Sequence, residues 1–398
     1  MIGTRPILGE GAVCSASARI AAAALVALLA APSAALAQQE GVPVFSAAEE
    51  IDLSGRFQLQ GVTSSCSGDL PEADSPCTTN VPGVDWFARR ARLSATVKVN
   101  DFISGKIEPD YGSVSGVTLR DAYGMLTFGP EARLQIGQFK KPFDGFHLTS
   151  STQILTIERD LDIPGVPGPR ALSMAELTTR NLLSSYDLGV MLSGRIGEDL
   201  QYWAGTFDGR APAENGDVNT DKQFVGRLQY SLEAGELPLS LAVAGALTDL
   251  PYTGVEGRLA GQYYGNVELW AELGDFDGGP HVQAGWVMGE NALETPGGVT
   301  PTPPNADLAT MHSWQVIGSW KKAVDGVEHV EAVEPLLRVS VAEPNTDIAN
   351  DAVYGFTPGV QVFFSGRNKV ALNWDIVSFA DDATSSANSF KVQYQFHF

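Results

Sequence analysis

The chain has 398 residues, of which 44% are hydrophobic, and its formal net charge at pH 7 is −21. That charge disfavours nucleic acid as a partner, because binding to a phosphate backbone requires a basic surface. The mean hydropathy of −0.02 excludes a bundle of transmembrane helices. It does not exclude a β-barrel in a membrane, in which only alternate residues face lipid.

Residues 1–37 have the pattern of a secretory signal peptide. Two arginines accompany an apolar segment, Ile20 to Leu29, that is too short to cross a membrane as a helix. Ala35-Leu36-Ala37 supplies the small residues of a cleavage site. The sequence therefore predicts an exported protein whose mature chain is residues 38–398, and an N-terminal membrane anchor is the alternative.

The mature chain alternates between polar and apolar residues in segments of about ten residues, the length at which a tilted strand crosses the hydrocarbon. Trp86 to Val99 shows this most clearly, with Leu93 on one face and Arg92 on the other. Because successive side chains of a strand point to opposite faces, each segment is predicted to be a transmembrane strand. The predicted strands are Leu53 to Val62, Trp86 to Val99, Ile103 to Glu108, Thr118 to Phe128, Ala132 to Lys140, Asp187 to Ile196, Leu200 to Phe207, Gln223 to Leu232, Leu239 to Leu247, Val267 to Leu273, Val282 to Met288, Ser313 to Lys321, Pro335 to Ala342, Val353 to Phe364, Lys369 to Ser378 and Ser389 to Phe398.

These segments predict one all-β domain over residues 38–398, a transmembrane antiparallel β-barrel of about 16 strands around a water-filled channel. The alternation is least regular between Leu250 and Lys321, where a hairpin gained or lost would give 18 or 14 strands. The last segment places its aromatic residues on one face and ends on Phe398. We expect it to close the barrel by pairing with both Lys369 to Ser378 and Leu53 to Val62.

One long segment, Lys141 to Ser185, interrupts the alternation and contains several prolines. A loop of this length in an otherwise regular array is usually functional. We expect it to fold into the lumen and narrow the pore, and an extracellular flap is the alternative.

Several short fragments of the first half of the chain follow one another in a fixed order and spacing. They are Ala88-Arg89-Arg90-Ala91-Arg92-Leu93, Leu119-Arg120-Asp121-Ala122-Tyr123, Ile136-Gly137-Gln138-Phe139-Lys140-Lys141-Pro142-Phe143, Leu148-Thr149-Ser150-Ser151 and Glu158-Arg159. Together they resemble the phosphate-selective porin O and P family. The resemblance implies a trimeric outer-membrane channel of 16 strands whose third loop, here Lys141 to Ser185, dips into the pore. It also implies passive uptake of anions such as phosphate.

The basic residues are concentrated in the first strands. Between Ser54 and Pro142 there are ten Lys/Arg and nine Asp/Glu, whereas between Leu228 and Phe398 there are seven Lys/Arg and 21 Asp/Glu. A charge on the lipid face at mid-depth costs roughly 2–4 kcal/mol, so the cations of these strands should face the lumen. The candidate pore-lining and anion-binding residues are Arg56, Arg90, Arg92, Lys98, Lys106, Arg120, Arg133, Lys140 and Lys141.

Two hypotheses for these cations remain open. They could form a basic ladder that guides anions, and arginine suits phosphate because its planar fork bonds two oxygens at once. Alternatively, they could pair with acids across the lumen, such as Glu108 and Asp110, and only keep the wall wet.

The mature chain contains two cysteines, Cys66 and Cys77, which flank a polar loop. In an oxidising compartment we expect them to form a disulfide. A metal pair is the weaker alternative because no histidine lies nearby. We expect neither a metal ion nor another cofactor.

The sequence thus predicts a porin of the bacterial outer membrane, a channel for passive diffusion of small hydrophilic solutes and ions with a preference for anions such as phosphate. The net charge keeps a general or cation-preferring porin as the alternative, and a plugged structural or adhesion barrel is a further one. An enzyme is not expected, because none of the five histidines lies in a recognisable nucleophile motif and G-x-S-x-G does not occur. The expected partners are outer-membrane lipid, small anions, two further copies in a homotrimer, and the barrel assembly machinery acting on the C-terminal strand.

Overall fold

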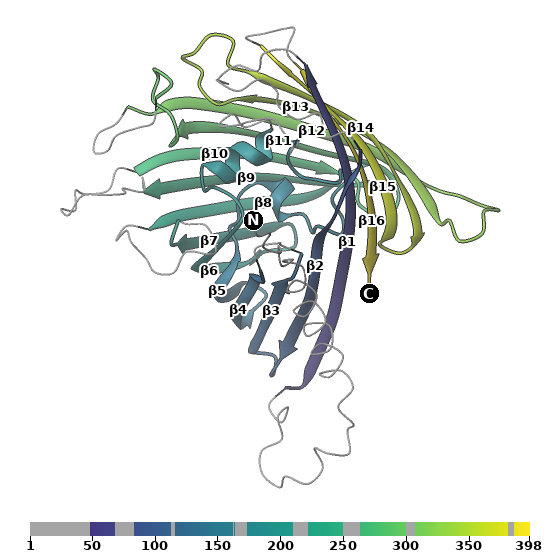
Figure 1. The fold of residues 1–398 in the computed structure, drawn as a ribbon. Coiled ribbons are helices and arrows are strands. Elements are labelled where there is room, and N and C mark those ends of the chain that lie inside the picture. Colours follow the sequence, from purple (N-terminus) through teal and green to yellow (C-terminus); the bar gives the residue numbers. More distant parts are fainter. Residues whose placement is uncertain are drawn as a thin grey trace, which may run out of the picture. The chain divides into compact units, whose positions relative to one another are not determined.

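The computed structural model describes residues 48–67, 83–112, 116–161, 163, 173–209, 222–249, 263–299, 307–380 and 386–398. These residues form a closed barrel of sixteen strands in which all neighbouring strands are antiparallel (Figure 1). The strands are β1 (Glu50–Ser67), β2 (Asp85–Lys98), β3 (Ile103–Asp110), β4 (Thr118–Gly129), β5 (Ala132–Lys140), β6 (Tyr186–Ile196), β7 (Leu200–Phe207), β8 (Gln223–Ala234), β9 (Leu237–Asp249), β10 (Tyr263–Leu273), β11 (Gly279–Asn291), β12 (Ala309–Ala323), β13 (Ala332–Glu343), β14 (Val353–Ser365), β15 (Asn368–Phe379) and β16 (Ser386–His397). The predicted fold class and the count of 16 strands are confirmed.

To within one residue, each predicted strand lies inside an observed one. β5 and β7 have the predicted bounds, and most of the others extend further at one or both ends. β1 continues to Ser67 and β10 begins at Tyr263, because pairing with the neighbouring strands persists where the alternation of the sequence has ended. The alternation therefore locates the strands but underestimates their length.

The barrel closes between β1 and β16, as the C-terminal pattern predicted. The register pairs Gln58 with Gln395, and β16 pairs on its other side with β15. Beyond the strand end, the backbone groups of Gly55 and Phe398 exchange two hydrogen bonds of 3.0 and 3.1 Å. A Cβ at Gly55 would overlap the Phe398 ring as it is placed here, so a larger residue would displace that ring. The closure leaves no open sheet edge.

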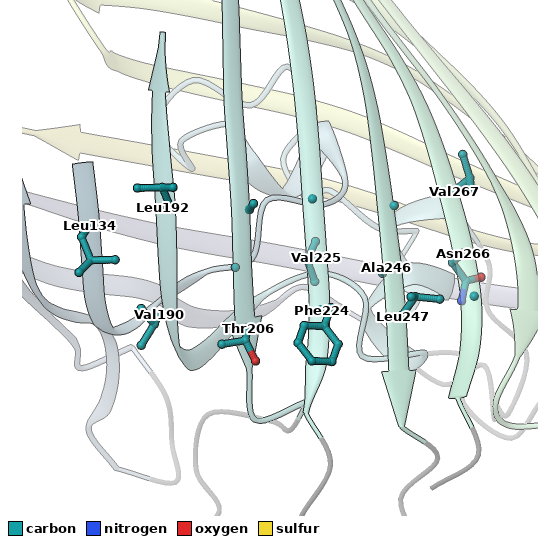
Figure 2. A pocket seen from close by; sticks show the side chains of 15 residues that line it. Leu134, Val190, Leu192, Thr206, Phe224, Val225, Ala246, Leu247, Asn266 and Val267 are labelled. Atoms are coloured by element: carbon teal, nitrogen blue, oxygen red, sulfur yellow. The ribbon is translucent and has the colours of Figure 1, made fainter. Parts of the chain in front are cut away.

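The two faces of the wall differ in polarity. Outward residues such as Leu53 and Trp374 are 65% and 50% exposed, whereas inward residues such as Gln315 and Gln393 are buried. A shallow apolar depression of about 760 Å³ extends over the neighbouring strands β5 to β10. Figure 2 shows Leu192, Phe224 and Leu247 among the side chains that line it. This apolar-out, polar-in arrangement suits a wall that faces hydrocarbon.

Residues 141–185, between β5 and β6, contain α2 (Gly145–Leu148) and α3 (Met174–Arg180). The described parts of this segment contact strands on different sides of the barrel: Asp144 meets β10, Leu155 meets β14 and Ser151 meets β1. These contacts place the described parts of the segment inside the closed wall, and we call the described residues between Lys141 and Ser185 the inserted loop. Among the described residues, no helix is long and apolar enough to cross a membrane.

Glu268 of β10 holds the start of the inserted loop. Its carboxylate accepts hydrogen bonds from the backbone N–H groups of Asp144 and Gly145, both at 2.8 Å, and pairs with Arg227 of β8 at 3.0 Å. Gly145 is required at this point because a Cβ would run into the indole ring of Trp270. All the charged groups of this anchor are buried, so each depends on the others for its hydrogen bonds.

Arg338 of β13 holds the middle of the inserted loop. One of its amino groups donates to the backbone carbonyls of residues 158–160 at 3.1–3.2 Å, and the other donates to Asp375 at 2.8 Å. Three glutamines of the wall bind carbonyls of residues 151–155 in the same way: Gln58, Gln361 and Gln395. Side-chain donors of the wall thus satisfy loop carbonyls that are buried away from water.

Replacing Glu268 by alanine leaves the Arg227 guanidinium and two backbone N–H groups buried without a partner, which we expect to cost about 3–5 kcal/mol of stability. The urea midpoint for unfolding of the detergent-solubilised barrel, followed by tryptophan fluorescence, should fall. The control is Glu272→Ala in the same strand, because the Glu272 side chain is 25% exposed and its hydrogen bonds go to residues of β11. An equal fall in both variants would contradict the anchoring role of Glu268.

Candidate functional site

Two β-bulges bring extra arginines to the inner face of the wall. In β2, residues 90 and 88 pair with successive residues of β1, so Arg89 is the extra residue. In β4, residues 121 and 119 pair with successive residues of β3, so Arg120 is the extra residue. A bulge re-aims a side chain that strict alternation would send to the other face. Consecutive charged residues at these two points can therefore share the interior.

Glu158 of the inserted loop binds both Arg89 and Arg90. Arg89 donates to it at 2.5 and 3.0 Å, and Arg90 donates at 2.9 Å. Burial alone would raise the pKa of Glu158, but the two guanidiniums outweigh burial and hold the pKa well below its usual range. A carboxylate with a lowered pKa keeps its ion pair until the pH falls through that lowered value. The link between the loop and β2 therefore survives acidification that protonates ordinary carboxylates.

A second set of ion pairs lies on β3 and its neighbours. Glu108 lies 2.9 Å from Arg56 and 3.3 Å from Arg92. It also lies 3.2 Å from Lys106, while Asp110 lies 2.7 Å from Arg92. The pairing of wall cations with Glu108 and Asp110, which was one of the two hypotheses, is thus present in the structure.

Three further cations, Arg120, Lys140 and Arg159, form a row that we call the cationic row. The Arg120 guanidinium and the Lys140 ammonium lie 5.6 and 5.8 Å from the centre of the same ring, that of Tyr186. Lys140 and Arg159 both donate to the backbone carbonyl of Thr149, at 3.3 and 2.5 Å. A ring and a carbonyl, both uncharged, therefore connect the three positive charges.

Within the described residues, the row makes a single ion pair with a carboxylate, that of Arg120 with Asp110. Lys140 and Arg159 direct their hydrogen bonds to backbone carbonyls of the inserted loop. Arg120 lies 3.4 Å from Asp110, whose same oxygen already accepts from Arg92 at 2.7 Å. The Arg120 atom in this ion pair is Nε, which is buried and makes no hydrogen bond in the described structure. The row is consequently the part of the interior best prepared to receive an anion.

The paired cations and the cationic row together have an excess of positive charge, and we call them, with their carboxylates, the basic cluster. Its eight cations are Arg56, Arg89, Arg90, Arg92, Lys106, Arg120, Lys140 and Arg159. Its five carboxylates are Glu108, Asp110, Asp121, Glu158 and Asp160. Eight cations against five carboxylates leave three positive charges, in a chain whose net charge is −21.

Six of the predicted residues belong to the basic cluster, and three lie outside it. Lys98 lies 2.6 Å from Asp101 at the turn between β2 and β3. Arg133 of β5 makes no ion pair with a described carboxylate, and its Nε is buried without a hydrogen bond. Lys141 is buried 3.3 Å from Asp187, where the inserted loop leaves and rejoins the wall.

Sequence reasoning missed five members of the cluster: Arg89, Asp121, Glu158, Arg159 and Asp160. Strict alternation assigns Arg89 to the face opposite Arg90, and only the bulge brings both inside. Glu158 and Arg159 lie in a segment without periodicity, so no pattern of faces could select them. The one signal for them was their place among the fragments that resemble a known family.

Two predictions fall on residues that the structure does not describe. The signal peptide occupies residues 1–37, and the disulfide involves Cys77 and the side chain of Cys66. Both remain predictions.

Several solved barrels are similar to this chain. The outer membrane channel DcaP of Acinetobacter baumannii is 14% identical, with a TM-score of 0.57 over 90% of this chain and 100% of that chain. OmpF of Salmonella typhi in complex with daunomycin is 11% identical, with a TM-score of 0.53 over 89% and 100% of the two chains. OmpT of Vibrio cholerae, an outer membrane protein in trimer form, is 13% identical, with a TM-score of 0.50 over 88% and 99%. At these identities the similarity establishes the fold alone.

A search of curated proteins found none that matches the chain. The model of a family described as phosphate-selective porin O and P matches residues 62–267, which is more than half of the 398 residues. The matched part contains the inserted loop and every member of the basic cluster except Arg56. The chain therefore belongs to the phosphate-selective porin O and P family, and it is an outer-membrane β-barrel that forms a passive diffusion channel.

Proposed function

We propose that this channel passes small anions in preference to cations, and that inorganic phosphate is among its solutes. The basic cluster carries this preference. The observation that supports it most directly is the cationic row of Arg120, Lys140 and Arg159, whose contacts are mainly a ring and backbone carbonyls, with one ion pair of 3.4 Å from Arg120 to Asp110.

The physical reason is the repulsion among like charges that are held close together and partly removed from water. An anion at the row relieves this repulsion and adds negative charge to a row whose one described ion pair is that of Arg120 with Asp110. The guanidinium groups of Arg120 and Arg159 can each present two N–H groups to a phosphate, and Lys140 adds a point charge.

Transport also requires that the solute leaves. The cations on the neighbouring wall share their charge with Glu108 and Asp110, so only part of the positive charge acts on a solute. The paired cations therefore contribute a moderate positive potential, and the row contributes the local binding. This division of roles favours attraction of anions without trapping them.

A general or cation-preferring porin is the second candidate. It is supported by the net charge of −21 and by the excess of acids after Leu228. The measurement of ion selectivity given below separates the two candidates. The family and the fold indicate a channel rather than an enzyme.

The remaining proposals concern maturation. Residues 1–37 would be removed on export to give a mature chain of residues 38–398, and Cys66 and Cys77 would then form a disulfide in the oxidising compartment. The positively charged, apolar and small-residue regions of the N-terminal segment support the first proposal.

We also propose that the mature protein assembles as a homotrimer in outer-membrane lipid. The trimer form of the structurally similar OmpT supports this state. The exposed apolar outer face supports contact with lipid. The aromatic C-terminal strand ending at Phe398 supports recognition by the barrel assembly machinery.

The reconstituted channel should give a reversal potential that indicates anion preference under a gradient of potassium chloride. The double variant Arg120→Gln/Arg159→Gln should lower the anion-to-cation permeability ratio about two-fold or more, because the ion concentration at a wall follows its potential. Lys98→Gln removes one positive charge outside the basic cluster. It should change the permeability ratio less than the double variant does. Cation preference of the unaltered channel would refute the anion hypothesis and leave the channel intact.

Inorganic phosphate should reduce the chloride current by occupying the cationic row. In Lys140→Gln the concentration needed for half-maximal reduction should rise about tenfold, which corresponds to the loss of one charge-assisted hydrogen bond. Lys222→Gln is the control, since Lys222 pairs with Asp208 outside the cluster. A chloride current that no concentration of phosphate reduces would exclude phosphate as a ligand of the row.

The mass of the protein purified from outer membranes should correspond to a chain that begins at residue 38. Without reducing agent, it should be lower than the mass of the reduced chain by two thiol hydrogens. A mass that includes residues 1–37 would contradict cleavage, and equal masses before and after reduction would contradict the disulfide.

A further inference from the structure

A second polar cavity lies inside the barrel, separate from the basic cluster. Its volume is about 210 Å³, and it is bounded by β12 to β15, by the turns between β10 and β11 and between β14 and β15, and by residues 152–153 of the inserted loop. The size is below the usual range of about 300–1,000 Å³ for drug-sized ligands. It is suited to a small metabolite.

Three cations line this cavity without an ion pair to any described carboxylate. Lys321 donates to the carbonyl of Phe276 at 3.0 Å, and Lys369 donates to the carbonyl of Ile154 at 3.3 Å. Arg367 donates to the hydroxyl of Thr152 at 3.2 Å. All three acceptors are neutral, and Lys369 is only 4% exposed. A buried ammonium without an anionic partner is costly, so the cavity is prepared for an anionic group.

The same cavity contains acceptors that form no direct ion pair with a described cation. The carboxylate of Glu334 is buried and accepts one hydrogen bond, from the Ser319 hydroxyl at 2.7 Å. Gln361, its direct neighbour across β13 and β14, is 1% exposed, and its Oε1 atom has no hydrogen-bond partner in the described structure. Asp277 adds an exposed carboxylate at the turn between β10 and β11. These oxygens are prepared for a donor that carries positive charge.

The ring of Phe363 also lines the cavity, with Lys321 at 4.3 Å and Lys369 at 5.5 Å from its centre. Phe363 pairs directly with Lys369 in the register of β14 and β15, two residues from Gln361. The unpaired cations and the unpaired acceptors thus belong to one contiguous patch of the inner wall.

We propose that this cavity binds a small zwitterion of the size of an α-amino acid. Its carboxylate lies toward Lys369 and Arg367, and its ammonium group lies toward Glu334 and the Oε1 atom of Gln361. A molecule that carries both charges satisfies both sets at once, whereas a simple anion leaves Glu334 without a cationic donor and the Oε1 atom of Gln361 without any donor. The cavity shares no residue with the basic cluster, so this assignment does not depend on the anion preference of the channel.

The test compares three probes of similar size at neutral pH: L-alanine, L-lactate and ethylammonium. L-lactate has the shape of L-alanine with a hydroxyl in place of the ammonium group, and ethylammonium lacks the carboxylate. Binding to the folded, detergent-solubilised barrel is followed by saturation-transfer NMR, which suits weak ligands. We expect saturable binding of L-alanine and binding about tenfold weaker or more for each of the other two.

Variants assign the two ends of the ligand. Glu334→Gln and Lys369→Gln should each weaken binding of L-alanine about tenfold, and Glu334→Gln should leave L-lactate unaffected. The controls are Glu343→Gln, at the other end of the same strand, and the exposed Lys322→Gln, neither of which lines the cavity.

Two results would overturn the proposal: no saturable binding of L-alanine, or equal binding of L-alanine and L-lactate. The comparison of probes on the unaltered protein decides the question even where a variant fails to fold. A failure of the zwitterion proposal can be told apart from a failure of the anion hypothesis. The anion hypothesis is tested by the reversal potential and depends on different residues.

Discussion

A loop packed against the inner wall of a barrel must find hydrogen-bond partners for the backbone groups that this packing buries, and this constraint governs the interior of this protein. Glu268 accepts hydrogen bonds from the N–H groups at the start of the inserted loop, and Arg338 donates hydrogen bonds to the carbonyls of residues 158–160. Glutamine side chains of β1, β14 and β16 donate hydrogen bonds to backbone carbonyls of residues 151–155. Because these partners stand on several sides of the wall, the loop is held at many points, and the places of Glu158 and Arg159 follow from them.

The cations of the interior consequently divide into two kinds. Arg89 and Arg90 bind Glu158 and so belong to the attachment of the loop, and its carboxylate cancels one of their two positive charges. Lys140 and Arg159 are held by carbonyls, which orient a cation without cancelling its charge. A loop that is positioned through backbone carbonyls therefore leaves its cations available, whereas one positioned through carboxylates does not.

Much of this fold could be predicted from the sequence, because a wall with lipid on one side and water on the other requires a two-residue period. The period gave the sixteen strands, their order of pairing at the closure, and the inward direction of residues such as Arg90 and Arg92. It could not give Arg89, since a bulge is a local exception to the period. It also could not give Arg338 or Glu268 as anchors, because their partners lie in a loop whose path has no periodic signal. The same limit applies to the pairing of Arg56 with Glu108, which depends on the register between strands.

The net charge of −21 would suggest that anions are repelled, but a solute responds to the potential where it passes. Salt screens exposed charges that lie more than about 8 Å away, whereas buried charges are screened less. Acidic residues such as Glu328 and Asp101 stand in exposed turns, with side chains 86% and 97% exposed, and act weakly at a distance. The three surplus positive charges of the basic cluster act inside the wall, where few carboxylates remain unpaired. The sign of the selectivity is therefore set by the balance of paired and unpaired groups along the path, and the composition of the chain does not determine it.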